Sequence, residues 1–452
     1  MSDEQTFLDA LSARDTRRGA EPTWIAARRQ AGAARFEALG FPTRRDEAFK
    51  YTDVRAIARG DFTLAQDAQD VAPLSPATAA ALTLPLEALR LTFVDGIFAP
   101  ELSDLAALPA GVSVEPLSQA LADNHEAVGG ALGRLAGVDF SPFTALNTAF
   151  AEEGAVIRLA PGSVVETPIL VQFLSRANAT PLMSHPRVLI EAGARSQATV
   201  IEHQVGEEGA ANFSNLVSEV MLERGAILTH YKLQEASLKD LHVSSLHIDQ
   251  GRDSRFTSFN LNLGGSLVRN DIVAELNAQG AETNYFGLFF AQGRQHVDNH
   301  TLVNHNAPHT FSNENYKGIL GDRAHGVFNG KVVVRRDSQK IEAHQSNANL
   351  LLSDRAEIDT KPELEIYADD VKCSHGATTG QLDEEAIFAL RARGIGEETA
   401  RGLLTLAFAG EVMDQVALDA VAERVERTVA GKLPERFNLA GLVEVAAALD
   451  EE

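Results

Sequence analysis

A cysteine and a histidine two residues apart, Cys373 and His375, are the residues of this sequence best suited to chemistry. Cys373 is the only cysteine among 452 residues and lies in the run DDVKCSHGATTG. In a strand, residues two apart project from the same face, so a thiol and an imidazole would point together. Such groups bind zinc, copper or iron–sulfur species, or form a thiolate–imidazole nucleophile. One cysteine holds no cluster alone, so the pair works with a partner chain, acts as a lone nucleophile, or is structural.

Several segments of the chain resemble those of a known family. The stretch IYADDVKCSHGATTG resembles the signature of the SufD-type iron–sulfur cluster assembly proteins, which have a close paralogue family, SufB. PTRRDEAFKYTD, from Pro42 to Asp53, is similar to the N-terminal motif of that family, with Phe49 where tryptophan is usual. QHVDNHTLVNHN, NENYKGILGDRAHGVFNGKVVV and QSNANLLLS resemble the core that SufB and SufD share. The matches run from about residue 40 to about residue 415, and Thr379 stands where valine is more usual.

The resemblance implies a non-catalytic subunit of a SufBCD-type complex, which pairs with a SufB-type paralogue and docks an ATPase of the SufC type. The complex would assemble iron–sulfur clusters and support their transfer to apo-proteins. Cys373 and His375 would face SufB at the contact between the two chains and supply ligands or proton control for a nascent cluster. A neighbouring imidazolium can lower the pKa of a thiol. We expect no cofactor or metal tightly bound to the isolated chain, and a transient cluster shared with SufB.

Two alternatives stay open. A β-helix carbohydrate-active enzyme would need export and paired carboxylates across a groove, whereas the adjacent Asp369 and Asp370 would face opposite ways in a strand. The SufB paralogue itself is expected to carry several cysteines, and this chain has one. The runs G-x-x-x-x-G-K-[ST], G-x-S-x-G and H-E-x-x-H are absent from the sequence. ATP hydrolysis through a P-loop would therefore belong to another chain.

The middle of the chain, residues 151–380, consists of short apolar strands separated by polar turns, with hardly any helical period. Gly193, Gly225, Gly251 and Gly280 mark corresponding turns, at steps of 32, 26 and 29 residues. Recurrence at this length indicates a solenoid or an array. The predicted fold class is therefore mainly β, a right-handed parallel β-helix flanked by N-terminal and C-terminal helical segments. The alternative is a β-sandwich.

Helical and mixed regions are predicted on both sides of this core. In residues 1–150, a helical period around Trp24 ends at Gly40 and Pro42, and LRLTFVDGIF reads as strand. In residues 381–452, helices are predicted from Asp383 to Arg393, from Glu397 to Val416, and around the valines 421, 425 and 429. These C-terminal helices would cap the solenoid and dock the ATPase. The residues assigned to that docking are Arg391, Arg393, Leu403, Leu404 and Phe408, although the apolar ones also fit a buried helix face.

The histidine-rich stretch QHVDNHTLVNHNAPHT is a candidate metal site of a different kind. His296, Asp298 and His300 alternate, so one strand face would present them together, and His305 and His309 follow. Imidazole and carboxylate groups in such an arrangement ligate zinc or iron. Turns and edges of β-helices also carry rows of polar residues, so we predict that these histidines belong to the framework.

Composition limits the remaining classes of function. The formal net charge of −23 argues against binding to a nucleic-acid backbone. No apolar run is long enough to span a bilayer, and MSDEQTFLDALSARD lacks the pattern of a secretory signal. Scarce cysteine fits a reducing compartment. We therefore expect a cytoplasmic protein without nucleic-acid or membrane partners.

Overall fold

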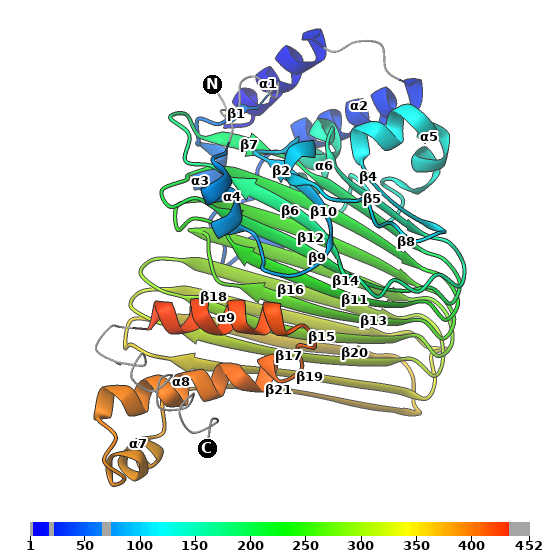
Figure 1. Ribbon diagram of the computed structural model, residues 1–452. Helices are drawn as coiled ribbons and strands as arrows, with labels where there is room; N and C mark the ends of the chain where they lie inside the picture. The colour runs from blue at the N-terminus through cyan, green and yellow to red at the C-terminus, as the bar shows by residue number, and fades with distance from the viewer. Residues whose placement is uncertain (1–2, 18–21, 66–73, 434–452) are drawn as a thin grey trace.

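The centre of the molecule is a parallel β-helix of about eight turns (Figure 1). The computed structural model describes residues 3–17, 22–65 and 74–433. Each turn contributes one strand to each of two sheets, called here sheet A and sheet B, so alternate strands along the chain are neighbours. The long strands pair in parallel and in register, as Leu216 does with Ser244. The predicted parallel β-helix is confirmed, and the β-sandwich is excluded because its strands would be antiparallel.

Both sheets begin with short strands near the N-terminus and end at β20 and β21. Strands from both sides of residue 150 share them, because β4 pairs with β5 and β2 pairs with β6. Sheet A contains β4 (Val112–Pro116), β5 (Gly154–Leu159), β8 (Arg187–Ala192), β10 (Phe213–Leu222), β12 (Leu241–Gln250), β14 (Leu267–Leu276), β16 (His296–His305), β18 (His325–Val334) and β20 (Glu357–Ile366). In the same sheet, β7 (Leu182–Ser184) pairs with β10, and β1 (Thr63–Leu64) pairs with β7. Sheet B contains β3 (Ile97–Phe98), β2 (Leu89–Val94), β6 (Ile169–Ser175), β9 (Gln197–Gly206), β11 (Ile227–Glu235), β13 (Arg255–Asn262), β15 (Glu282–Ala291), β17 (Phe311–Leu320), β19 (Ile341–Leu351) and β21 (Val371–Gly380).

One corner of successive turns is made by residues with positive φ. Gly225 and Gly280 have φ of 69° and 76°, and Arg195 and Asp253 take the same role in other turns with φ of 57° and 55°. The predicted turn glycines therefore differ in position: Gly225 and Gly280 form the corner itself, whereas Gly193 does not. Gly193 precedes such a corner by two residues, and a Cβ there would stand 2.6 Å from the carbonyl oxygen of Leu159. A side chain is excluded at that point because two turns of backbone lie in contact.

The N-terminal helices cover the outer face of sheet A at the start of β10, β12 and β14. Phenylalanines from the helices, among them Phe7, Phe36 and Phe143, pack with Phe213 of β10 in one apolar cluster. A Cβ at Gly32 would lie 2.7 Å from backbone atoms of α6, so this glycine lets α2 and α6 approach closely. The predicted stop of α2 is confirmed at Gly40, which has φ of 62°. LRLTFVDGIF forms the hairpin of β2 and β3.

The C-terminal helices lie on the outer face of sheet B, except that α7 projects beyond the β-helix (Figure 1). Asp383 is the N-cap of α7 as predicted, and Gly394 has φ of 91° after the helix. The valines of α9 are buried against apolar residues of β11, β13 and β15, in agreement with their four-residue spacing. The last residues of the predicted C-terminal domain, 434–452, lie outside the described residues.

The helices within the described ranges include α5 and α6, which the sequence pattern did not separate from the looser stretch before residue 150. Two further 3₁₀ turns, η1 and η2, lie between the early elements. The bounds are α1 (Asp3–Arg17), α2 (Thr23–Leu39), η1 (Glu47–Phe49), α3 (Arg55–Ala58), α4 (Pro76–Leu82), η2 (Pro100–Leu102), α5 (Leu117–Ala131), α6 (Pro142–Phe150), α7 (Glu384–Arg391), α8 (Glu397–Met413) and α9 (Asp419–Lys432). No helix in these ranges has the length and apolar character needed to cross a membrane.

Candidate functional site

The β-helix is open at its C-terminal end, where β20 and β21 are the outermost strands of the two sheets. β21 pairs with β19 on one side, and its other edge has no strand partner in the described part of the chain. Most residues of β21 are exposed, in contrast to the buried strands of the preceding turns. An unpaired strand edge presents free backbone N–H and C=O groups to which another strand can bond. The open end is therefore where a second chain can extend the sheets.

Cys373 and His375 lie on this outermost strand and, being two residues apart, project from the same face. Their register partners on β19 are Ala343 and Gln345, both buried, so the face in question looks into the space between the two sheets. Cys373 is half-buried and packs against the apolar interior. His375 is exposed, and its ring forms no hydrogen bond with any described residue. The structure thus places both residues on the terminal strand, where their two-residue spacing puts them on one face, and their role in cluster assembly stays a prediction.

The environment of Cys373 differs from the expectation of an activated thiolate. Burial raises the pKa of the Cys373 thiol, and a backbone hydrogen bond at Ala343 only partly offsets this effect. A raised pKa keeps the thiol protonated at neutral pH, because a low-dielectric surrounding disfavours the charged form. The thiol therefore needs a metal or a positive group from elsewhere to lose its proton.

Beneath His375 lies a row of buried polar side chains that sequence reasoning missed. Gln345 is the register partner of His375, and Glu314 is the register partner of Gln345 on the strand below. The Nε2 of Gln345 donates to Oε1 of Glu314 at 3.4 Å, and the hydroxyl of Thr301 donates to the other carboxylate oxygen. Burial raises the pKa of Glu314 to about 7. Register partners on neighbouring strands of one sheet are about 30 residues apart in this row. The sequence does not show which residues are partners, so the row is visible only once the register of the strands is known.

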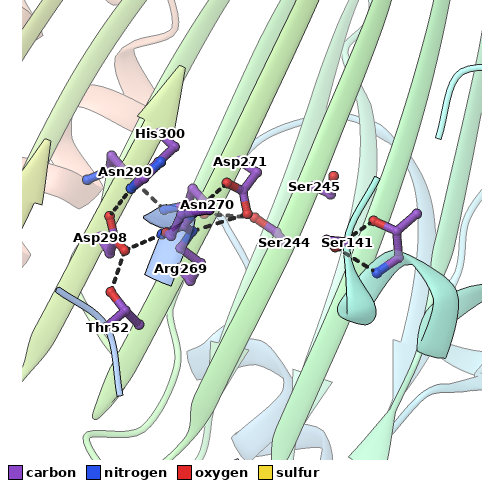
Figure 2. Close-up of polar contacts among 12 residues, drawn as sticks. Thr52, Ser141, Ser244, Ser245, Arg269, Asn270, Asp271, Asp298, Asn299 and His300 are labelled. Atoms are coloured by element: carbon purple, nitrogen blue, oxygen red, sulfur yellow. Dashed lines mark hydrogen bonds and ion pairs between the residues drawn. The ribbon is translucent and has the colours of Figure 1, made fainter. Parts of the chain in front are cut away.

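The histidine-rich stretch forms β16 and the corner after it, on a part of the sheet that the N-terminal motif covers. Asp298 lies between Thr52 and Arg269 and accepts a hydrogen bond from each (Figure 2). His300 contacts the same carboxylate, with its Nε2 at 3.1 Å from Oδ1. His296 lies 2.8 Å from the hydroxyl of Thr52. The carboxylate and both histidines are thus engaged in attaching residues 47–52 to sheet A.

The other two histidines have separate surroundings. His305 faces the interior, where its ring nitrogens lie 2.7 Å from the hydroxyl of Thr310 and 2.9 Å from that of Ser312. His309 is a corner residue with φ of 58°. Among the described residues, no group of three or more His, Cys, Asp and Glu side chains is placed to hold a metal ion. That these histidines belong to the framework stays a prediction. The contacts show which neighbouring residues His296, His300 and His305 would hold in place.

Phe49, where the family motif usually has tryptophan, also contributes to this attachment. The guanidinium of Arg269 lies 4.7 Å from the centre of the Phe49 ring, and its Nη1 donates to the carbonyl oxygen of Ala48 at 2.9 Å. A cation held over an aromatic face is attracted by the negative ring quadrupole. The N-terminal motif is therefore a clasp that holds the N-terminal region on the β-helix.

The residues assigned to ATPase docking are not equivalent in the structure. Arg391 and Arg393 are exposed, and Leu403 and Leu404 are half-buried. Phe408 packs on the β-helix, where the ammonium of Lys317 lies 4.3 Å from its ring centre and donates to its carbonyl oxygen at 3.2 Å. Phe408 therefore attaches α8 to the core.

A residue outside that set, Phe388 of α7, has 71% of its surface exposed. Its helix projects from the body, and no sequence pattern distinguished it from buried helix residues. An aromatic side chain this exposed on a projecting helix is a candidate anchor for a partner.

The fold and the open end define a class of protein, a parallel β-helix with helices on the outer faces of its sheets and a cysteine–histidine pair on an unpaired terminal strand. The C-terminal helices do not cap this end of the solenoid, because they pack on the outer face of sheet B. Comparison with known proteins identifies the family of this chain. Residues 173–408 match the family model of the SUF system FeS cluster assembly SufBD core domain, and residues 1–171 match the SufBD protein N-terminal region. The chain belongs to the SufBD family.

Relatives of this chain agree with that membership over nearly their whole length. An iron–sulfur cluster assembly SufBD family protein of Synechocystis is 34% identical, covering 93% of this chain and 94% of the relative. The iron–sulfur cluster assembly protein SufD of Escherichia coli is 31% identical, covering 87% of this chain and 90% of the relative. Protein ABCI7, chloroplastic, of Arabidopsis thaliana is 28% identical over 87% of this chain and 83% of the relative. None of these names supports the carbohydrate-enzyme alternative.

Proposed function

We propose that this chain is the SufD-type, non-catalytic subunit of a cytoplasmic SufBCD-type complex that assembles iron–sulfur clusters. The observation that carries the proposal is the position of Cys373 and His375 on β21, the unpaired strand at the open end. A paralogous β-helix that pairs its own terminal strands with β20 and β21 would enclose both side chains at the contact between the chains. The single cysteine in the chain supports SufD over SufB.

In this arrangement the cluster is cargo held between two chains. Cys373 supplies one sulfur ligand, and His375 supplies an imidazole that can ligate iron or move a proton. The remaining ligands come from the SufB-type chain, because the described residues around the pair offer no third ligating side chain. The positive charge of bound iron would remove the proton that burial otherwise holds on the Cys373 thiol.

The SufC-type ATPase would dock on the projecting C-terminal helices. Phe388, Arg391 and Arg393 are the exposed residues of this region that suit a partner, with an aromatic anchor beside two cations. Leu403 and Leu404 are only half-exposed and would contribute at the margin, whereas Phe408 would act indirectly by fixing α8.

Co-expression tests the proposal. The chain is produced with candidate SufB-type and SufC-type chains, the complex is isolated through a tag on this chain, and its absorption spectrum is recorded after anaerobic supply of iron and sulfide. We expect all three chains to co-purify and a cluster chromophore to form, which His375→Ala reduces without loss of the SufB-type chain. Failure of the SufB-type chain to bind, with both chains folded, would contradict the proposal.

A further inference from the structure

Gln345 carries a buried hydrogen-bond acceptor that lacks a partner, and it lies directly beneath His375. Its side chain is 4% exposed, and its Oε1 bonds with no described atom. A buried acceptor left unpaired is destabilising, so such an atom usually has a donor in some state of the protein. Gln345 and His375 are register partners on adjacent parallel strands, and both side chains project into the space between the sheets.

The surroundings hold the Gln345 amide in one orientation. Its Nε2 donates to Oε1 of Glu314, whose other oxygen accepts from Thr301. Thr301, Glu314 and Gln345 come from β16, β17 and β19, so strands of two successive turns fix this row. Because Nε2 of Gln345 donates to Glu314 on β17, Oε1 is the amide atom left to accept from a donor on β21. The row therefore ends in an oriented acceptor at the open end of the β-helix.

The opposite sheet leaves room for this amide. A Cβ at Gly330 would lie 2.0 Å from Nε2 of Gln345, so any side chain at residue 330 would displace it. His375 is the register partner of Gln345 on the next strand, and its ring, which carries an N–H donor, is exposed at the open end. The acceptor and the donor thus match in chemistry and in position.

We propose that Gln345, oriented by Glu314 and Thr301, is a positioning residue that accepts the N–H of His375 when the open end is covered by a partner chain. This bond fixes one ring nitrogen as the donor, and the other nitrogen is then free to face the cluster site. Histidines that act on metals are commonly held in this way by an acceptor on the far ring nitrogen. The inference rests on the proposed function, since it gives His375 a defined orientation within the assembled complex.

The test replaces Gln345 by methionine, which has similar volume and no amide, in the complex with the SufB-type chain. Asn347→Leu is the matched control, because Asn347 is a buried amide on the same face of β19 that lies beneath Ala377. Histidine labelled with ¹⁵N is observed at pH 8, where an ordinary imidazole is neutral. The signal of His375 is assigned by its absence in His375→Gln.

We expect one dominant tautomer of His375 in the wild-type complex and in Asn347→Leu, and loss of that preference in Gln345→Met. Glu314→Gln retains an oxygen to accept from Gln345 and should keep the preference, whereas Glu314→Met should lose it. This second pair keeps the test decisive if Gln345→Met does not fold. An unchanged tautomer in both methionine variants would overturn the inference. Normal cluster assembly in His375→Ala would instead contradict the proposed function.

Discussion

Arg269 and Asp298 form an ion pair in which each side chain is only 1% exposed. The pair lies on the outer face of sheet A, and the same carboxylate accepts from Thr52 while the guanidinium stacks on Phe49. Two residues of β14 and β16 thereby hold a segment that is more than 200 positions away in sequence, since Thr52 and Asp298 are 246 residues apart. The attachment therefore accounts for the alternating His296, Asp298 and His300 of the histidine-rich stretch.

Asp298→Ala should destabilise the protein by about 3–5 kcal/mol, because it leaves a buried guanidinium without one of its counter-ions. Urea unfolding followed by circular dichroism measures the change. Asp271→Asn is the control, since Asp271 also pairs with Arg269 but is more exposed, at 15%. If Asp298→Ala lowers the free energy of unfolding no more than Asp271→Asn does, Asp298 does not have the proposed role in holding the N-terminal motif on sheet A.

The same ion pair predicts acid sensitivity. Arg269 and the nearby histidines hold the pKa of Asp298 far below its usual range, against the effect of burial. A carboxyl with a depressed folded-state pKa contributes stability above its unfolded pKa, near 4, and loses it as pH falls further. Between pH 5 and pH 2 the wild type should therefore lose more stability than Asp298→Asn, as measured by thermal melts in matched buffers.

Glu314 predicts the opposite pH dependence in a different window. Burial raises its pKa from 4.5 to about 7, so its contribution is fully favourable below pH 4.5 and is lost as pH rises through 7. Relative to wild type, Glu314→Gln should gain up to about 3 kcal/mol between pH 4 and pH 8.5. The comparison uses the difference between the two proteins, because Glu153 and Asp240 also have raised pKa values. A difference that is flat with pH would show that the Glu314 carboxyl does not titrate there.

Cys373→Ser and His375→Ala should impair cluster assembly and leave the fold intact. His375 is exposed and Cys373 is half-buried at an open end, so neither change opens a cavity in the core. We expect melting temperatures within about 2 °C of wild type, a strong loss of cluster-enzyme activity in cells for His375→Ala, and a partial loss for Cys373→Ser. Normal activity in both variants, or a large fall in melting temperature, would return the pair to a structural role.

Phe388→Ser should weaken ATPase docking by roughly tenfold or more in affinity, as truncation of a central aromatic anchor commonly does. Calorimetry with the SufC-type chain measures it. Phe408→Ala is the comparison: it should lower the melting temperature because Phe408 packs on Lys317 and the β-helix. Full affinity in Phe388→Ser would exclude α7 as the docking element.

A deletion after Gly380 should remove structural cover of the β-helix together with the proposed docking helices. The buried valines of α9 cover an apolar face of sheet B that includes Tyr231, Phe259 and Phe290. Removing the helices would expose that face to water, so we expect the shortened chain to aggregate. Retention of a soluble, folded β-helix after the deletion would show that this cover is dispensable.

The sequence by itself determined the elements whose signal is local. Strand and turn recurrence predicts the β-helix because every turn repeats one pattern of apolar strands separated by polar turns. The cap at Asp383 and the valine spacing of α9 are likewise properties of a few adjacent residues. The two-residue spacing of Cys373 and His375 placed both on one face before any strand partner was known.

Tertiary structure decided everything that depends on which turn lies above which. The register that stacks His375 on Gln345, and Gln345 on Glu314, joins residues about 30 positions apart. The raised pKa of Cys373 depends on how deeply the last strand lies in the apolar interior, which spacing alone does not fix. Phe388 and Phe408 occupy similar helical sequence, yet one is exposed and the other packs on Lys317. Burial is a property of the neighbours that folding brings together. Those neighbours are one turn away in sequence within a sheet, and much further away where a terminal segment packs on the β-helix.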